Sequence, residues 1–231
     1  MFSTKFSLGS IALAAGLLAS TAASALTLNT TDLKANATFA FSTQAFGSAT
    51  AAGVTVAAAG NTTRGANTAE GNPSFILPVT KAIVTIGWDL KIRTQSGESS
   101  GAALRLETPS LGGVGALANF NIDYTKNIVY CDIIDAFLGT TDAKVALYNG
   151  KIVSPEVISL KGFVLNQRSV LGNLIFTPEA AQKVGDVLLI DEVLRASLAT
   201  IDWGTIEAVV TSYKRPNKIS NAPFTLTSMG Y

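Results

Sequence analysis

Apolar and polar side chains alternate with a period of two along most of this chain, and this pattern constrains the fold more than any other feature. Such alternation is typical of a β-strand with one buried and one solvated face. It is clearest in residues 33–41 and 86–92, where every second position is apolar: Leu33, Ala35, Ala37, Phe39 and Phe41, then Ile86, Trp88, Leu90 and Ile92. Clean separation of the two faces favours antiparallel sheet over parallel sheet, which is buried on both sides.

Turn-forming residues between alternating segments predict a hairpin. Phe120, Ile122 and Tyr124 alternate with polar residues, and Thr125-Lys126-Asn127 then precedes the strand that contains Cys131. Further strands are predicted near residues 54–58, 74–80, 102–107, 143–148, 157–164, 170–176, 205–212 and 222–228. The Gly- and Asn-rich residues 57–73 predict an exposed loop, and the Gly/Ser-rich residues 94–101 predict a connection.

Two short capped helices are expected to interrupt the strands. In the second, Thr177 provides a capping hydroxyl, Pro178 occupies the first helical position, and Gly185 is the expected stop. The pattern of residues 188–199 fits helical spacing, but it leaves open whether part of this segment joins the sheet.

The first helix is predicted to start from a cap at Ser42 or Thr43 and to end at Gly53. The strand-to-helix junction in residues 40–45 is similar to that in residues 175–180, which suggests an internal duplication. The alternative is that such junctions simply favour the same chemistry. The expected fold is therefore mainly β: an antiparallel sandwich or open barrel-like sheets with two short capped helices.

The N-terminal residues predict export. Lys5 provides a basic start, residues 11–18 form an apolar stretch, and Ala23-Ser24-Ala25 matches a cleavage site. We expect residues 1–25 to be a signal peptide and residues 26–231 to form a single β-rich domain. The predicted location is the periplasm, the cell surface or the medium.

The balance of basic and acidic residues argues against two classes of partner, nucleic acids and anionic bilayers. Removal of the leader, with its single lysine, leaves 16 basic and 16 acidic residues. Nucleic acids and anionic bilayers attract proteins through a basic field, so neither is expected as the main partner. After the leader no apolar run approaches the ~18 residues of a membrane-spanning helix. The expected partner is a protein, a glycan or a small molecule, and the oligomeric state stays open.

The chain contains no histidine, which removes Ser-His-Asp and Cys-His catalysis and the usual nitrogen ligand of zinc. Carboxylate pairs at Asp132 and Asp135 or at Asp191 and Glu192 are the remaining catalytic candidates. Strand geometry places Asp132 and Asp135 on opposite faces, and isolated acidic pairs are usually solvated surface charge. We therefore expect a non-enzymatic protein with no catalytic residues, no metal site and no cofactor.

Cys131 and the tyrosines have two interpretations each. Cys131, the only cysteine, is predicted to be a free buried thiol on an apolar strand face, and the alternative is an intermolecular disulfide. A tyrosine on a strand usually packs its ring and hydrogen-bonds its hydroxyl. Alternatively, a phenolate can ligate haem iron, and the candidates are Tyr124, Tyr130, Tyr148 and Tyr213.

Several motifs resemble the HtaA type of haem-transport-associated domain, which occurs in exported and cell-wall proteins of bacteria. They lie in residues 39–42, 53–56, 75–80, 117–123 and 174–181. The resemblance implies an extracellular β-rich module, which in some members binds haem through a tyrosine supported by a histidine. Because this chain has no histidine, no site residue is carried over, and the cofactor-binding residues stay unknown.

These observations favour an exported, non-enzymatic protein of the cell envelope or medium that acts by surface binding or as a structural component. One alternative is a haem-binding transport module of the HtaA type. A second alternative is a fimbria-like fibre subunit completed by strand donation, because residues 33–41 and the pair Phe224 and Leu226 alternate as donor strands do.

Overall fold

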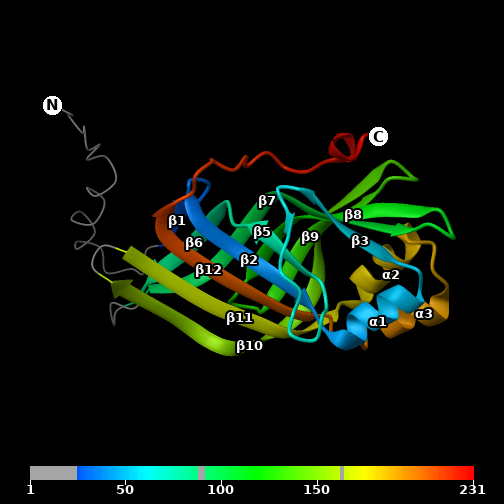
Figure 1. The fold of residues 1–231 in the computed structure, drawn as a ribbon, viewed down its shortest axis with the longest axis horizontal. Coiled ribbons are helices and arrows are strands. Elements are labelled where there is room, and N and C mark those ends of the chain that lie inside the picture. Colours follow the sequence, from blue (N-terminus) through cyan, green and yellow to red (C-terminus); the bar gives the residue numbers. More distant parts are fainter. Residues whose placement is uncertain (1–24, 88–91, 162–163) are drawn as a thin grey trace.

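The computed structural model describes residues 25–87, 92–161 and 164–231, and these residues form one antiparallel sheet with helices gathered at one end (Figure 1). The predicted leader, except for Ala25, lies outside the described residues. The mainly β class is confirmed, and of the two predicted forms the structure has the curled, barrel-like one.

The described part of the chain contains twelve strands and three α-helices. The strands are β1 (Ala25–Asn29), β2 (Leu33–Phe41), β3 (Thr55–Gly60), β4 (Thr63–Arg64), β5 (Ser74–Pro78), β6 (Lys81–Ile86), β7 (Ile92–Thr108), β8 (Gly113–Asp123), β9 (Ile128–Asp135), β10 (Thr140–Lys161), β11 (Val164–Phe176) and β12 (Gly204–Lys214). The helices are α1 (Thr43–Ala51), α2 (Pro178–Val187) and α3 (Glu192–Leu198), with a 3₁₀ turn, η2, at Leu226–Met229.

The sheet closes on itself at the bend between β5 and β6. Its strand order is β1-β6-β7-β8-β9-β10-β11-β12-β2-β5-β4, and β3 also pairs with β7. At the bend, the Val79 amide donates to Ala35 of β2 at 2.9 Å, and the Thr80 amide donates to Glu98 of β7 at 2.8 Å. Consecutive amides point to opposite edges of a strand. One continuous segment therefore joins the two sides of the curled sheet, and we call this junction the seam.

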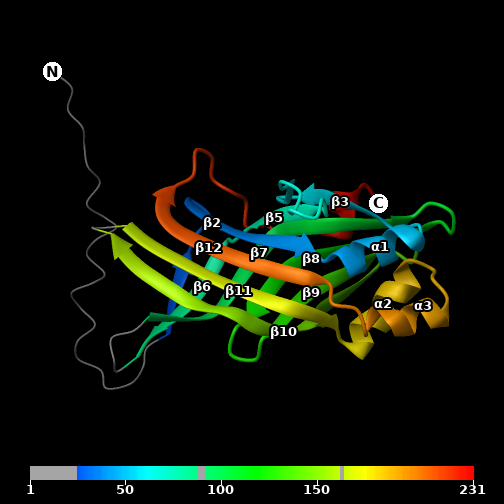
Figure 2. The same cartoon turned by 60° about the horizontal axis from the view of Figure 1, so that its bottom comes forward.

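The sheet is strongly curled (Figure 2), and one side-chain contact across its interior depends on that curl. Gln167 of β11 donates a hydrogen bond to the Thr94 hydroxyl of β7, although β8, β9 and β10 separate these strands in the sheet. Such a contact requires the sheet to curve until opposite strands face each other.

The three helices close one end of the curled sheet (Figure 1). Ser42 and Thr177 cap α1 and α2 as predicted, each accepting a hydrogen bond from the amide three residues later, at 3.0 and 3.1 Å. Each cap also donates to a carbonyl outside its own helix, of Asp202 and Ala146 respectively. The two junctions that the sequence aligned are thus built alike.

Two helix predictions need correction. The described chain has three α-helices, because residues 192–198 of the ambiguous segment form α3, which is capped by Asp191. Helix α2 continues past Gly185 to Val187, since a glycine inside a helix costs only about 1 kcal/mol. Gly185 lies against the Arg195 side chain of α3, where an added Cβ would lie 2.4 Å from Cγ.

Several strand boundaries also differ from prediction. Ile86 pairs with Ile92, so the chain reverses between them and the alternation of residues 86–92 belongs to two strands; its centre, residues 88–91, lies outside the described residues. Residues 94–101 form part of β7, and residues 57–60 form part of β3. Residues 222–228 form no strand; they contain coil and the start of η2.

An aromatic cluster fills the core next to the helices. Phe176 packs against Tyr148 in a tilted arrangement and against Trp203 edge to face, with ring centroids 4.6 and 4.8 Å apart, and Phe41 packs against Trp203 at 6.2 Å. These rings come from β2, β10, β11 and the segment before β12, so the cluster ties the strand ends together. The Trp203 indole donates to the Leu198 carbonyl at 3.0 Å, which anchors the end of α3 to the cluster.

Cys131 is a free, fully buried thiol on the face shared by Val129 and Ile133, as predicted. Burial, with a smaller contribution from the Asp132 charge, raises the pKa of this thiol well above its usual value. The thiolate is the reactive form of cysteine. Cys131 is therefore expected to be inert while the protein is folded.

This expectation can be tested with a thiol reagent. At pH 8 native protein should react with dithionitrobenzoate only at the rate of unfolding, whereas protein in guanidinium chloride should react at once with one equivalent. Fast stoichiometric labelling of the native protein, measured by absorbance, would contradict the buried placement.

The cap of α2 provides a second test. We expect Thr177→Ala to lower the free energy of unfolding by about 1–2 kcal/mol, because it removes the cap and the hydrogen bond to Ala146. Thr177→Ser keeps the hydroxyl and should retain most of the stability. Urea denaturation of both variants measures the difference in the free energy of unfolding. If both variants lost the same stability, the Thr177 methyl group and not its hydroxyl would be responsible.

Candidate binding groove on the outer face

A groove with a volume of about 700 Å³ runs across the outer face of the sheet. Its lining residues come from β6, β7, β8, β9, the β8–β9 turn and β10. Ligand sites are typically concave and of about this size. Of four cavities compared within the described residues, this groove has the largest volume and the most polar lining, which makes it the leading candidate site.

Strand pairing aligns four polar side chains into a row on the floor of the groove. Lys81 lies opposite Glu98, Glu98 opposite Asn121, and Asn121 opposite Tyr130, so β6, β7, β8 and β9 contribute one residue each. Neighbouring strands lie about 4.8 Å apart, so this row spans about 14 Å. We call these four residues the polar row.

The charges of the groove are balanced and tied to one another. Glu98, Asp123 and Asp132 face three lysines among the lining residues, Lys81, Lys126 and Lys144. Lys81 pairs with Glu98 at 2.8 Å and Lys126 pairs with Asp123 at 3.6 Å. Exposed pairs of this kind contribute little stability, but they leave the groove without net charge.

Asp123 is held in its ionised form by the β8–β9 turn. Burial acts to raise the pKa of this carboxyl, but hydrogen bonds from the Thr125 hydroxyl and from the Lys126 and Thr125 amides outweigh it and lower the pKa. The Thr125 hydroxyl and amide lie 2.6 and 2.9 Å from Oδ1. The carboxylate therefore shapes the turn at one end of the groove.

Several polar groups of the groove make no hydrogen bond within the described residues. The Tyr130 hydroxyl, the Asn121 amide and the Ser96 hydroxyl have no such partner. An amide offers both donors and an acceptor, and a hydroxyl offers both roles. The groove thus presents an aromatic ring beside donors and acceptors that a ligand can use.

Asn119 forms the other end of the groove. Its side-chain oxygen accepts from the Gly101 and Phe224 amides at 3.0 and 2.8 Å, and its Nδ2 donates to Asp132 and to the Phe224 carbonyl at 2.8 and 2.9 Å. The backbone of Asn119 is left-handed, with φ 53°, a conformation that asparagine tolerates better than most residues.

These hydrogen bonds fasten the segment after β12 to the outer face. We call residues 220–229 the tail. Phe224 is buried there in a small apolar cluster with Ala103, Ala116, Ala118 and Ile134, and Leu226 and Met229 pack against it. Asn61 of the β3–β4 turn donates to the Ser220 carbonyl at 2.8 Å. The tail therefore crosses the sheet where the groove ends.

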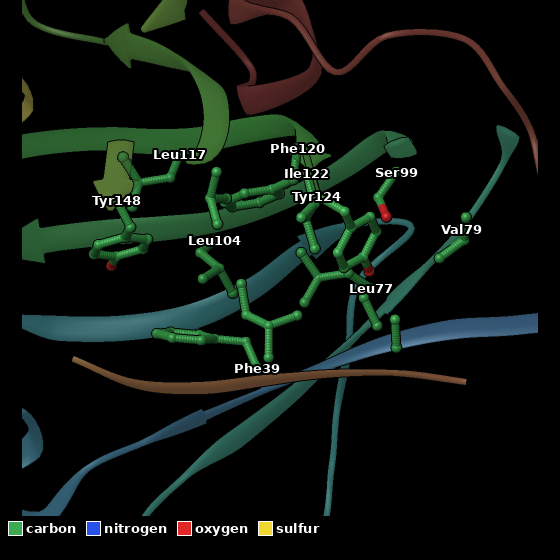
Figure 3. A pocket seen from close by; sticks show the side chains of 15 residues that line it. Phe39, Leu77, Val79, Ser99, Leu104, Leu117, Phe120, Ile122, Tyr124 and Tyr148 are labelled. Atoms are coloured by element: carbon green, nitrogen blue, oxygen red, sulfur yellow. The ribbon is translucent and has the colours of Figure 1, made fainter. Parts of the chain in front are cut away.

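Inside the curled sheet lies a narrow apolar cavity of about 30 Å³, with Tyr124 and Tyr148 at opposite ends (Figure 3). At the Tyr148 end it adjoins a second cavity of about 70 Å³ under the helices, which shares Tyr148 in its lining. At the Tyr124 end it adjoins an opening of about 400 Å³ that shares Tyr124. A cavity of 30 Å³ holds about one water molecule.

The structure separates the four candidate tyrosines. Tyr130 lies in the outer groove, Tyr124 and Tyr148 line the interior, and Tyr213 is 56% exposed on β12. Burial, with a smaller contribution from Cys131, raises the pKa of Tyr148 well above its usual value. This tyrosine therefore stays protonated.

The candidate carboxylates support the backbone. Asp191 caps α3, Asp135 accepts from the Leu138 amide at 2.9 Å, and Asp132 accepts from the Lys144 amide at 2.8 Å. No cluster of three potential metal-ligating side chains occurs in the described ranges. None of the helices in the described part of the chain has the length and apolar character to cross a membrane.

Comparisons with known proteins give one likeness. Among solved structures, the C-terminal domain of HtaA from Corynebacterium glutamicum aligns with a TM-score of 0.41 and 9% sequence identity, covering 78% of this chain and 98% of that domain. The chain resembles this domain. No residue role is taken from this comparison. No family model and no curated protein matches the chain.

Sequence reasoning did not find the groove. The alternation of residues 120–124 places Asn121 and Asp123 on the outer face, and this much was visible. Their alignment with Lys81 and Tyr130 depends on pairing across three strand boundaries, which no local pattern contains. The role of Asn119 was also missed, because an asparagine inside a predicted strand gives no sign of a left-handed backbone.

The role of Asn119 can be measured with glycine substitutions. Asn119→Gly keeps the left-handed backbone but removes four hydrogen bonds, so we expect a loss of about 2–4 kcal/mol in the free energy of unfolding. Hydrogen exchange within residues 220–229 should become faster as the tail is released.

Asn127→Gly is the matched control, because Asn127 has φ 57° and its buried side-chain oxygen has no hydrogen-bond partner within the described residues. This variant should unfold at nearly the wild-type urea concentration. A similar loss in the free energy of unfolding in Asn119→Gly and Asn127→Gly would contradict the role given to Asn119.

Proposed function

We propose that the protein is an exported, non-enzymatic binding protein that captures a neutral oligosaccharide in the outer groove. The polar row supports this proposal most strongly. It places the ring of Tyr130 beside the free amide of Asn121, in line with the Lys81–Glu98 ion pair. An aromatic face combined with adaptable hydrogen-bonding groups suits a ligand rich in hydroxyls.

The balance of charge favours an uncharged ligand over an ionic one. Lys81 and Lys126 already have carboxylate partners, and the Asp132 carboxylate accepts from Asn119 and the Lys144 backbone. An ionic ligand that bound at Lys81, Lys126 or Asp132 would have to compete with these contacts, at the cost of leaving a charge unpaired. A neutral ligand can hydrogen-bond to the same groups without displacing them.

The proposed absence of catalysis rests on the same contacts. Three of the four carboxylates considered for a glycosidase, those of Asp132, Asp135 and Asp191, accept hydrogen bonds from backbone amides. A retaining glycosidase needs two carboxyl groups about 5–5.5 Å apart that flank the bond to be cleaved. Asp132 and Asp135 instead support different segments of the backbone.

Haem binding is the competing function. An axial tyrosine ligates iron as the phenolate, and the raised pKa of Tyr148 opposes that form. Tyr124 is the remaining interior candidate.

A titration with haemin separates the two functions. Absence of a Soret shift would exclude haem binding. A Soret shift that Tyr124→Phe abolishes would show haem binding and overturn our proposal.

The fibre-subunit alternative receives less support from the pairing of β2. This strand pairs with β12 on one edge and with β5 on the other, all within one chain. Donating it would break two ladders of the sheet. Residues 224 and 226, the other candidate donor positions, pack onto the outer face of the same sheet.

A glycan array tests the proposal directly. We expect wild-type protein to bind one or more neutral oligosaccharides, and Tyr130→Ala to weaken that binding at least tenfold, as loss of an aromatic anchor usually does. Asn121→Ala should weaken it severalfold. Tyr213→Ala, which removes an exposed tyrosine of β12, should bind as the wild type does.

Ionic strength gives an independent criterion. Binding of a neutral ligand should change less than twofold between 0.05 and 0.5 M sodium chloride, because screening acts on charge pairs. Binding confined to anionic glycans, a steep salt dependence, or no retention on the array would each overturn the proposal.

A further inference from the structure

A lateral opening leads from the surface to the interior of the sheet where the β8–β9 hairpin stops short of its neighbours. The ladder between β7 and β8 begins only at Ser96 and Asp123, so residues 92–95 of β7 extend past it. On the other side, β10 extends past Asn149, which is the last residue paired with β9. The opening between these extensions is the cavity of about 400 Å³, which we call the window.

The window joins the apolar interior. It is lined by Tyr124 and Thr125 of the hairpin end, Ile152 of β10 and Ser169 of β11. Tyr124 also lines the inner cavity, whose other lining side chains are almost entirely aliphatic or aromatic. The hydrogen bond between Gln167 and Thr94 holds the two sides of the sheet together beside this opening.

A buried hydroxyl without a partner lines the window. Ser169 is 6% exposed, and its hydroxyl is buried without a hydrogen bond within the described residues. Buried polar groups nearly always have a partner. The unsatisfied Ser169 hydroxyl, at the edge of an apolar interior, therefore points to a missing molecule.

The surroundings define the chemistry of that molecule. No charged side chain lines the inner cavity in the described ranges. Arg93 is the charged residue at the rim of the window, and it already has an interaction partner. Of the two tyrosines that line the inner cavity, Tyr148 has a raised pKa and is therefore neutral. An ionised ligand would lose its hydration without gaining a counter-charge.

We propose that the window is a second binding site, distinct from the groove, for a small, neutral, mainly apolar molecule with one hydrogen-bonding group such as an alcohol. The polar group of the ligand bonds to Ser169, and its alkyl part lies against Tyr124 and Ile152 within the window. The window, at about 400 Å³, has room for a short alkyl chain, whereas the inner cavity of about 30 Å³ does not.

A displacement assay tests this site. The neutral fluorophore N-phenyl-1-naphthylamine should bind saturably to the purified protein with a rise in fluorescence, and octan-1-ol should displace it. Octanoate at pH 8 should compete at least tenfold more weakly than octan-1-ol. Octan-1-ol should also raise the melting temperature, since a ligand that binds only the folded state stabilises it.

Ser169→Ala separates binding from stability. We expect this variant to bind octan-1-ol about fivefold more weakly, which corresponds to the loss of one hydrogen bond. The variant should be as stable as the wild type or more stable, because it removes an unsatisfied buried hydroxyl. A purely structural serine would lower stability instead. Ser110→Ala, at the exposed β7–β8 turn, is the matched control and should change neither property.

Three outcomes would overturn the proposal: no saturable fluorophore binding, tighter binding of octanoate than of octan-1-ol, or equal octan-1-ol affinity in wild type and Ser169→Ala. The first outcome would mean that water alone satisfies the buried Ser169 hydroxyl. Tyr130→Ala should leave fluorophore binding unchanged, so failure at this site and failure at the groove can be told apart.

Discussion

The seam between β5 and β6 is the constraint on which the rest of the structure depends. Where the chain passes from one side of a curled sheet to the other, its backbone groups need hydrogen-bond partners on both sides. Buried backbone groups without partners are costly. Here the Val79 and Thr80 amides serve opposite edges, and Thr30, which is fully buried, donates its hydroxyl to the Val79 carbonyl at 2.8 Å. The Thr80 hydroxyl donates to the Glu98 carbonyl at 3.2 Å and accepts from the Ser100 amide at 3.1 Å. The bend is therefore fully bonded without water.

The seam also sets the register of the outer groove. The residue after Thr80 is Lys81, and the Thr80–Glu98 bond fixes Lys81 opposite Glu98. From there the ladders carry the alignment to Asn121 and Tyr130. Because side chains alternate with period two, a slip of one residue at the seam would turn Lys81 to the other face of the sheet and break its alignment with Glu98. The closure of the fold and the geometry of the candidate site thus rest on the same few hydrogen bonds.

The sequence was sufficient for those parts of the fold that are local. Alternation identified β2 and the β8–β9 hairpin, and a hydroxyl before a short helical pattern identified the caps of α1 and α2. Alternation was misleading where two strands read as one. Ile86 and Ile92 fit a single alternating pattern, but they face each other in the antiparallel ladder of β6 and β7. Phe224 and Leu226 have strand-like spacing, yet Phe224 lies in coil and Leu226 in η2. Their side chains pack in a small cluster with alanines of β7 and β8. The seam, the polar row and the window depend on long-range pairing, which local periodicity does not contain.

The position of Phe224 has a consequence for biogenesis. Every strand of the described sheet precedes the tail along the chain, and Asn119 makes two of its four hydrogen bonds with the Phe224 backbone: it accepts from the amide and donates to the carbonyl. Domains begin to fold from the N-terminal side during synthesis. The curled sheet can therefore assemble while the outer groove still lacks the contact that closes its Asn119 end. The contact that closes the Asn119 end of the groove can therefore form only after the segment that follows β12 has docked on the assembled sheet.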